Sequence, residues 1–406
     1  MSGSASGAMT RDGRLLLTAR GLRMFGYGFL SVLLALYLLG IGYAPAQIGL
    51  LFSVALAGGA AATLGLSLYA DRWGRRRALL ASALLMAAGG VALAERGSFA
   101  MLLLLAAAGG LSPSGQDVGP FQSLEQAALS QALPEPGRVM PYAWYNLIGA
   151  FAAALGALAA GAVPAALAHA GWTALAAQQV LLWLFSGVGV ALAGVYLFLS
   201  PTVEAPRRDG QAPRAGLHRS RSIVLRLSAL FGLDALAGGL VLQSLIALWL
   251  HERFGLGLEQ LGPLFFGTNV LSALSYLLAA PLAERFGLLN TMVFTHLPAN
   301  LLLILVPFMP AWPLAAVALL ARSALSQMDV PTRQAYTMVL VAPEERAAAA
   351  GVTNAVRPIA ASAAPAISGL AFQAAASGLP FILAGALKVV YDVLIWITFR
   401  RIRPSG

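Results

Sequence analysis

The chain contains no cysteine, and this absence excludes several kinds of site at once. Without thiols there is no disulfide framework, no thiolate metal site and no cysteine nucleophile. Charged residues are also scarce, at 10% of 406 residues, whereas a soluble protein of this length carries about a quarter. Hydrophobic residues make up 59% of the chain, and its mean hydropathy is +0.78. This composition predicts a protein that crosses a membrane several times.

The sequence also lacks the short motifs of common enzymes. It has no Gly-x-x-x-x-Gly-Lys nucleotide loop, no His-Glu-x-x-His and no Gly-x-Ser-x-Gly, and it has only four histidines. We therefore expect no enzyme activity, no cofactor, no metal and no ATP-driven pumping. The net charge of +10 does not indicate nucleic-acid binding, because the arginines gather at the ends of apolar segments rather than in a soluble patch.

Apolar runs that could cross a bilayer at about 20 residues per span recur along the chain. The twelve expected spans are 21–43, 47–70, 78–95, 98–130, 138–164, 172–200, 222–250, 258–283, 288–309, 313–340, 347–375 and 379–400. A polar stretch rich in arginine and proline divides them six and six. We expect an N-terminal six-helix bundle at 1–200, a cytoplasmic linker at 201–221 and a C-terminal six-helix bundle at 222–406.

The loop arginines predict the orientation of these spans. If both termini lie inside, nearly all of them fall in cytoplasmic segments, and the outer loops hold only Arg96 and Arg253. Short loops rich in arginine and lysine stay cytoplasmic during membrane insertion. We therefore expect a multi-pass protein of the bacterial inner (plasma) membrane with both termini in the cytoplasm.

The two halves of the sequence resemble each other at a nearly constant offset, which indicates an internal repeat. The matched stretches are Ala35-Leu36-Tyr37-Leu38 with Ala247-Leu248-Trp249-Leu250, Gln47-Ile48-Gly49 with Gln260-Leu261-Gly262, Asp71-Arg72-Trp73-Gly74 with Glu284-Arg285-Phe286-Gly287, Asp117 with Asp329, and Arg138, Asn146 and Gly161 with Arg346, Asn354 and Gly369. Both copies run in the same direction, so the repeats are parallel.

The loop after the second span carries a recognisable pattern. Its residues Asp71, Arg72, Gly74, Arg75 and Arg76 match the Gly-x-x-x-Asp-Arg-x-Gly-Arg-Arg/Lys sequence of the major facilitator superfamily. Ser67 stands in place of the first glycine. With twelve spans, a central linker and a repeat, the whole chain resembles a transporter of that family. Within the family it is most similar to drug/proton antiporters, although the Gly-Pro pattern of their fifth span is missing.

This resemblance implies an all-α membrane protein of twelve transmembrane helices in two pseudo-symmetric six-helix bundles. It also implies secondary active transport by alternating access, with the loop as a cytoplasmic gate. Asp71 and Arg75 would latch onto the start of the eleventh span, near Glu345, while the molecule faces outward. The remaining residues assigned to this gate are Arg72, Gly74, Arg76, Glu284, Arg285 and Arg333. The alternative is a basic loop that only anchors the chain.

Ionisable residues inside apolar spans are costly and therefore mark candidate sites. Asp234 and Arg357 lie near the expected midplane, where they either take part in coupling and binding or pair with each other across a cavity. Lys388 and Asp392 are spaced i, i+4, and we interpret them as a self-neutralising structural pair. The other candidates for binding or coupling are Asp117, Tyr145, Asn146, Gln243, Arg322, Asp329 and Asn354.

Some of these residues have more than one interpretation. Asp329 with Arg333 forms either a gate or a clamp that holds the fold, and Asp117 with Asp329 could form a pseudo-symmetric gate. His296 is interpreted as a hydrogen-bonded helix histidine without a functional role.

Two transport functions fit this sequence. The first is proton-coupled efflux of a small organic solute, with Asp234 as the first candidate to carry the proton and Asp117 as the second. The alternative is proton-coupled transport of an organic anion, with Arg357 and Arg322 as charge partners. In both cases the partners are a small-molecule substrate, protons and the lipid bilayer, and we expect a monomer that binds no nucleic acid. A sensor that does not transport would need an appended domain or a long tail.

Overall fold

The structure is a computed structural model of the chain, and it describes residues 10–115, 119–132, 139–204, 220–342 and 345–400. Sixteen α-helices and two short 3-10 helices form in these residues, and no strand occurs among them. The α-helices are α1 (Arg11–Gly40), α2 (Pro45–Trp73), α3 (Arg75–Ala94), α4 (Phe99–Ala107), α5 (Pro120–Ala132), α6 (Val139–His169), α7 (Ala174–Leu197), α8 (Arg221–Leu240), α9 (Gln243–Phe254), α10 (Leu258–Phe286), α11 (Leu288–Leu305), α12 (Trp312–Leu325), α13 (Asp329–Leu340), α14 (Arg346–Ser362), α15 (Ala364–Gln373) and α16 (Leu379–Phe399). The 3-10 helices are η2 (Pro201–Val203) and η3 (Val306–Phe308).

Ten helical stretches in the described part are long and apolar enough to cross a membrane. The fourth and tenth expected spans are not among them, because each is built from two shorter helices. α4 has 9 residues and α5 has 13, while α12 has 14 and α13 has 12. The break before α5 ends at Pro120, which is the first residue of that helix. The arrangement is consistent with twelve spans.

The first helix begins ten residues before the predicted start at residue 21. Thr10 caps it, and its hydroxyl accepts a hydrogen bond from the Gly13 amide at 3.1 Å. Asp12 lies in the first turn, where an acidic side chain favours the helix dipole. Leu16 is fully buried, so the early turns pack against the protein although arginines interrupt the apolar run. Capping and packing thus extend α1 beyond its hydrophobic core.

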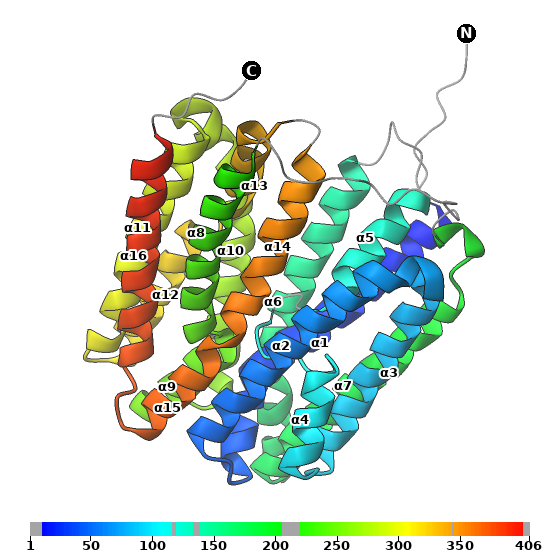
Figure 1. Ribbon diagram of the computed structural model, residues 1–406. Coiled ribbons are helices and arrows are strands. Elements are labelled where there is room, and N and C mark those ends of the chain that lie inside the picture. The colour runs from blue at the N-terminus through cyan, green and yellow to red at the C-terminus, as the bar shows by residue number, and fades with distance from the viewer. Residues whose placement is uncertain (1–9, 116–118, 133–138, 205–219, 343–344, 401–406) are drawn as a thin grey trace.

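The helices form two groups that lie side by side (Figure 1). In the first group α1 packs on α6 and α7, and α3 packs on α7. In the second group α8 packs on α14 and α16, and α11 packs on α16. The groups meet where α2 crosses α14 and α15 and where α6 crosses α10. Each half of the sequence therefore repeats the same pattern of helix pairs.

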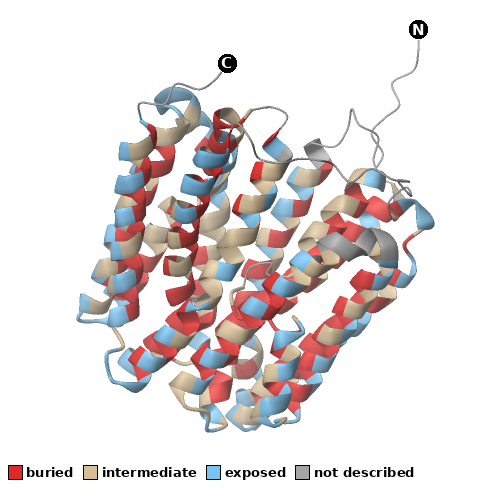
Figure 2. Ribbon diagram, viewed as in Figure 1, coloured by how far each residue is buried: buried red, intermediate tan, exposed pale blue. Residues whose placement is uncertain are grey.

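Burial follows the contacts between the helices (Figure 2). Buried residues line the sides that face neighbouring helices, while large apolar side chains cover much of the outer surface. Leu104 is 72% exposed and Phe308 is 65% exposed. A soluble protein rarely exposes many such side chains together, whereas a bilayer accommodates them. The surface is that of a protein surrounded by lipid.

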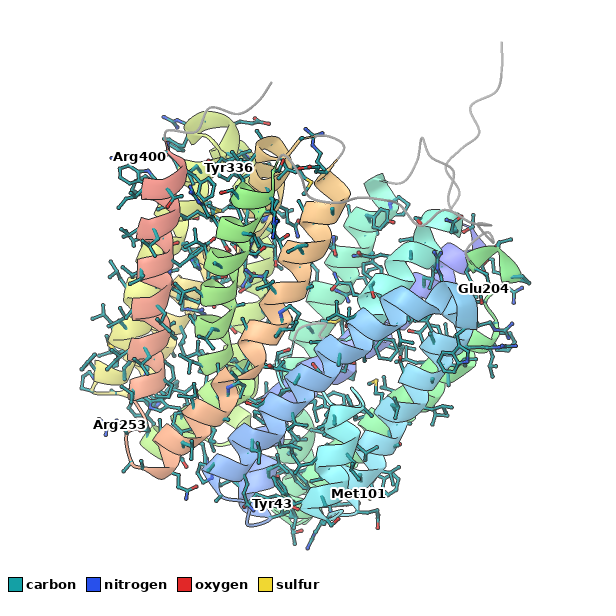
Figure 3. The ribbon with its side chains drawn as sticks, viewed as in Figure 1. Tyr43, Met101, Glu204, Arg253, Tyr336 and Arg400 are labelled. Atoms are coloured by element: carbon teal, nitrogen blue, oxygen red, sulfur yellow. The ribbon has the colours of Figure 1, made fainter. Side chains whose placement is uncertain are left out.

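The chain presents two opposite faces, which Figure 3 marks with its labels. We call the side where α1 begins and α16 ends the terminal face, and Glu204, Tyr336 and Arg400 lie toward it. We call the opposite side, where α1 ends, the distal face, and Tyr43 and Arg253 lie there. These names locate the site below.

Two close crossings join the groups toward the distal face. A Cβ atom on Gly49 in α2 would lie 2.4 Å from the Pro365 carbonyl oxygen and 2.9 Å from the Gly369 Cα in α15. In the same way, a Cβ on Gly161 in α6 would lie 2.5 Å from the Leu258 carbonyl oxygen, beside Gly262 of α10. Only glycine permits backbones to approach this closely. The backbones of the two groups therefore pack in close contact on the distal side.

Candidate functional site

A cavity of about 940 Å³ lies between the two groups. Most of its described lining comes from α8 to α14, and the first group contributes only Leu56, Ser114 and Gly115. Its inner end lies at the break between α8 and α9, where Val241 and Leu242 line it. Exposed lining residues lie on α13 and α14 toward the terminal face, whereas the distal side is held by the glycine crossings. The cavity therefore opens toward the terminal face.

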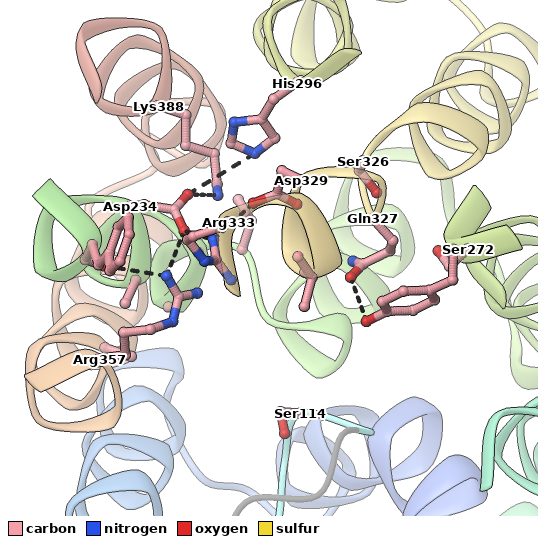
Figure 4. A pocket seen from close by; sticks show the side chains of 18 of the residues that line it. Ser114, Asp234, Ser272, His296, Ser326, Gln327, Asp329, Arg333, Arg357 and Lys388 are labelled. Carbon is pink, nitrogen blue, oxygen red and sulfur yellow. Dashed lines mark hydrogen bonds and ion pairs between the residues drawn. The ribbon is translucent and has the colours of Figure 1, made fainter. Parts of the chain in front are cut away.

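Asp234 is the centre of the charges in this cavity (Figure 4). It lies in α8 and is only 3% exposed. Its Oδ1 is 2.5 Å from Lys388 Nζ of α16, and its Oδ2 is 3.0 Å from an Arg357 nitrogen of α14 and 3.3 Å from an Arg333 nitrogen of α13. Four helices are thus tied together at one buried carboxylate. The sequence analysis gave Asp234 and Arg357 either a role in coupling and binding or a pairing with each other. The structure shows that they pair, and their role in coupling and binding stays a prediction.

The other charges of the cavity wall come from α12 and α13. Arg333 also contacts Asp329 one turn away, at 2.7 Å, so it connects the two carboxylates Asp329 and Asp234. Arg333 lines the cavity, and its predicted role in the cytoplasmic gate stays a prediction. Arg322 lines the cavity as well, and its Nε is buried without a hydrogen-bond partner among the described residues. A buried guanidinium nitrogen without a partner is uncommon in proteins and calls for an explanation.

Lys388 and Asp392 do not form the pair that their spacing predicted. Lys388 Nζ contacts Asp234, while Asp392 faces the other way and is fully buried against α11. Asp392 Oδ1 is 2.9 Å from His296 Nδ1, and its Oδ2 accepts a hydrogen bond from Asn300 at 2.8 Å. The i, i+4 interpretation was wrong because Asp234 offers Lys388 a closer carboxylate from another helix. His296 forms a hydrogen bond as expected, but it also lines the cavity.

Polar, uncharged side chains cover the opposite wall and the floor. Tyr276 donates a hydrogen bond to the Gln327 side chain at 3.0 Å (Figure 4). Gln243, a predicted site residue, donates to Ser31 of α1 at 2.9 Å and so connects the two groups at the cavity floor. The remaining amides of the wall are Asn269, Gln334 and the predicted Asn354. The cavity thus has a charged wall and a hydrogen-bonding wall.

Two other predicted site residues that the structure describes do not line this cavity. Asn146 is exposed on α6. Tyr145 is buried within the first group, where its hydroxyl donates to Glu125 at 2.7 Å. The predicted Asp117 lies outside the described residues. The candidates from the second half of the sequence come together, whereas the two described candidates from the first half do not.

A buried ion pair in the first group was missed by the sequence analysis. Arg23 of α1 and Glu125 of α5 are both fully buried and meet through two hydrogen bonds of 2.5 and 2.9 Å. Tyr145 and Tyr196 donate their hydroxyls to the same carboxylate. Phe121 lies under the guanidinium, with its ring centre 4.7 Å away. The available signal was Glu125 itself, because a carboxylate in an apolar span requires a cation from another span.

Comparison with known proteins identifies the family of this fold. The family model described as Major Facilitator Superfamily matches residues 16–365. The chain belongs to the major facilitator superfamily. The uncharacterized membrane protein YJR124C of Saccharomyces cerevisiae is 28% identical over 96% of this chain and 94% of its own length. Transporters of this superfamily are also found among similar solved structures.

Two of these solved structures show how widely the fold is shared. A bacterial homolog of the human lysosomal transporter Spinster, in an inward-facing and occupied conformation, is 15% identical with a TM-score of 0.75 over 96% of each chain. The human organic anion transporter MFSD10 is 19% identical with a TM-score of 0.61 over 95% of this chain and 100% of that one. At such identities the likeness establishes the fold alone.

The loop characteristic of the superfamily is built here around Glu204, just after η2. Its carboxylate accepts the backbone amides of Arg75 at 2.6 Å and of Arg76 at 3.2 Å, so it caps the start of α3. Gly74 precedes them with a φ of 98°, which favours glycine. The Arg76 side chain donates to the carbonyls of Tyr196 and Leu197 at the end of α7. These contacts hold the loop against its own half.

The rest of the predicted gate is only partly described. The side chains of Asp71 and Arg72 lie outside the described residues. In the second copy of the loop Glu284 and Arg285 are exposed, and Arg285 lies over Phe286 with 5.2 Å between the guanidinium carbon and the ring centre. Glu345, at the start of α14, accepts the Ser220 amide before α8 at 2.7 Å. Acidic side chains thus anchor both described ends of the central linker, at Glu204 and Ser220.

Proposed function

We propose that this superfamily member is a secondary active transporter that moves a small organic anion by alternating access. In this proposal the two halves are residues 1–200 and 222–406, with six spans each, joined by the linker at 201–221. The arginine-rich loops place the terminal face in the cytoplasm. Proton flow across the plasma membrane supplies the energy.

The charge of the cavity carries the proposal. Among its described lining residues the fully charged cations are Arg322, Arg333, Arg357 and Lys388, against the carboxylates Asp234 and Asp329. Asp234 and Asp329 are already engaged by these cations. A positive excess therefore remains inside an apolar protein, where charges interact more strongly than in water. An anion would neutralise this excess, whereas a cationic solute would be repelled.

Arg322 and Arg357 are the residues best placed to bind the anion. The Arg357 side chain is 27% exposed, so part of its guanidinium faces the cavity even while it contacts Asp234. Arg322 has a buried nitrogen without a partner among the described residues. Arginine holds carboxylates and phosphates through paired hydrogen bonds. The amides of the opposite wall would bind the polar body of the ligand.

This proposal takes the second of the two sequence interpretations. The first, efflux driven by a proton on Asp234, requires that carboxylate to be neutralised. A neutral Asp234 would leave Lys388, Arg333 and Arg357 facing one another with only Asp329 nearby. Removing one partner from a buried ion network is strongly unfavourable. Asp234 is therefore proposed as the fixed anion that holds the cations in place.

A ligand screen on the purified protein tests the proposal. We expect organic anions to raise the melting temperature, and neutral or cationic solutes to leave it unchanged. Arg322→Gln and Arg357→Gln should each weaken anion binding by about tenfold or more, because hydrogen bonds to charged groups contribute about 1.5–3 kcal/mol. Arg322→Gln is the cleaner variant, since Arg357 also contacts Asp234.

The control for this screen is Arg253→Gln. Arg253 lies at the distal face, beside Phe254 and away from the cavity. This variant should bind the same anions as the unchanged protein. Stabilisation by cationic or neutral solutes that is insensitive to Arg322→Gln and Arg357→Gln would refute the proposal.

A further inference from the structure

We propose that His296, held by Asp392, takes up the coupling proton and that this proton strengthens anion binding. Anion and proton then cross the membrane in the same direction. The inference rests on the proposed function for its anion and goes beyond it by naming the proton site. It also gives a role to a histidine that the sequence analysis regarded as structural.

The geometry fixes which nitrogen of the imidazole can accept a proton. His296 is 4% exposed, and its Nδ1 lies 2.9 Å from Oδ1 of Asp392. An ionised carboxylate only accepts hydrogen bonds, so Nδ1 carries the hydrogen and Nε2 keeps its lone pair. Nε2 is directed to the cavity side, 3.9 Å from Oδ1 of Asp234 (Figure 4). Asn300 bonds the other Asp392 oxygen at 2.8 Å and so fixes that carboxylate behind the ring.

The groups around His296 come from every helix that packs near it. The titratable and charged groups are Asp234 on α8, Tyr276 on α10, Arg322 on α12, Asp329 and Arg333 on α13, Arg357 on α14, and Lys388, Tyr391 and Asp392 on α16. The imidazole lies between two carboxylates, Asp234 and Asp392, each within 4.0 Å of one ring nitrogen. A proton on Nε2 would therefore face the Asp234 carboxylate while Nδ1 stays bonded to Asp392.

The remaining carboxylates are less suited to this role. A proton on Asp234 would leave Lys388 and Arg357 without the carboxylate that they contact. A proton on Asp329 would take away the nearer of the two carboxylates that Arg333 contacts. Asp392 meets only His296 and Asn300 among the described residues within bonding distance. Histidine is also the side chain whose ordinary pKa lies nearest to physiological pH. His296 is thus the group through which a proton can be exchanged while the ion pairs stay intact.

Proton uptake at His296 changes the charge that a ligand meets. The proton comes from water in the cavity, binds Nε2 and adds one positive charge to a wall that already has a positive excess. The protonated ring also competes with Lys388, because both face Oδ1 of Asp234. Lys388 is then less strongly held by that oxygen and is available to an anion. By reciprocity, a bound anion raises the affinity of His296 for its proton.

Histidine NMR on the purified full chain tests the proton site without any knowledge of the natural ligand. With ring-labelled histidine, the signal that disappears in His296→Gln identifies His296. We expect this signal to change when the pH is lowered, which reports proton uptake at Nε2. Asp392→Asn should move the midpoint, and Asp392→Glu, which keeps the carboxylate, should restore it. His251→Gln is the control, because His251 bonds the Leu256 carbonyl at the distal end of α9 and should remove a different signal.

Sulfate, which stays charged over the pH range of this titration, serves as the anion probe. We expect sulfate to raise the His296 midpoint more than sodium chloride does at equal ionic strength. In the unchanged protein, sulfate affinity should be about tenfold higher at pH 5.5 than at pH 8, within the usual range of coupling between sites. His296→Gln should lose this pH dependence.

The outcomes separate the two proposals. A His296 signal that does not titrate, or that is unaffected by Asp392→Asn or by sulfate, would overturn the inference while leaving the anion site intact. Anion binding that is insensitive to Arg322→Gln would instead refute the proposed function. If His296→Gln fails to fold, the Asp392→Asn and Asp392→Glu pair decides the question alone.

Discussion

At the scale of single residues, the buried Arg23–Glu125 pair makes the protein sensitive to the loss of either charge. Both side chains are fully buried, and two tyrosine hydroxyls complete the carboxylate's hydrogen bonds. When two opposite charges are buried away from water, removing one of them leaves the other buried and unpaired, which is strongly destabilising. The cluster ties α1 to α5, α6 and α7, so it holds the first group together away from the cavity.

Glu125→Gln should therefore destabilise the protein without altering its ligand. The substitution keeps the shape of the side chain but leaves Arg23 with an uncompensated charge, at a cost of about 3–5 kcal/mol. Thermal unfolding of the purified protein should show a markedly lower melting temperature. Glu95→Gln, at an exposed glutamate after α3, should have almost no effect. Equal melting temperatures for the two variants would contradict this assignment.

The sequence indicated which residues would be charged and buried, but not how they pair. Asp234, Arg322, Asp329 and Arg357 were found because charges stand out in apolar spans, and all four line the cavity. Their partners could not be predicted, since periodicity relates residues only along one helix. Asp234 meets cations from α13, α14 and α16, a relation set by tertiary packing. For the same reason Lys388 was assigned to the wrong carboxylate.

At the scale of helices, the sequence predicted where each span lies along the chain better than whether the span is one unbroken helix. The expected spans at 258–283 and 379–400 agree closely with α10 and α16. The span expected at 222–250 is instead divided into α8 and α9, and that expected at 313–340 into α12 and α13. Non-helical backbone is tolerated inside a membrane where it lines a cavity. Hydropathy does not record the break between α8 and α9, because Val241 and Leu242 at this break are apolar.

The glycine crossings give a prediction at the same scale. Gly49→Trp should separate α2 from α15 and favour a conformation that opens at the distal face, since its Cβ would overlap the Pro365 carbonyl. The natural chain has no cysteine, so Gln243→Cys places one label site on the cavity floor. An impermeant maleimide added from the distal side should react with this cysteine on the order of tenfold faster in the Gly49→Trp variant, if the conformation open at the distal face becomes dominant.

The control is Gly194→Trp, because Gly194 of α7 faces open space. That variant should label like the unchanged protein. A folded Gly49→Trp variant with the original labelling rate would show that this crossing does not close the distal side.

At the scale of the whole molecule, the crossings show how the internal repeat is used. The sequence matched Gly49 with Gly262 and Gly161 with Gly369 as equivalent positions. In the structure each glycine contacts one from the other pair, so Gly49 meets Gly369 and Gly161 meets Gly262. A two-fold relation between the halves produces this exchange. The sequence revealed the equivalence but not the contact, because a repeat states which positions correspond and not how the halves meet.

In the proposed alternating-access cycle the terminal face closes when the distal face opens, and the loop at Asp71 is predicted to stabilise that closed form. Asp71→Asn should slow exchange severalfold in proteoliposomes and leave equilibrium anion affinity unchanged. The loop would then affect the populations of conformations rather than the cavity itself. Counterflow and equilibrium binding, measured on the same preparation, check the two effects. An altered ligand preference would place Asp71 in the binding site instead.

The two halves contribute unequally to the cavity lining, and this has a consequence for the effects of substitutions in each half. Nearly all of its described side chains belong to the second half, while the first half supplies Leu56, Ser114 and Gly115. Under the proposed function, substitutions among the described lining residues of the second half would change what is carried, whereas substitutions at the buried Arg23–Glu125 pair of the first half would change stability. Ligand choice and stability would then depend on different halves of a chain whose two halves resemble each other.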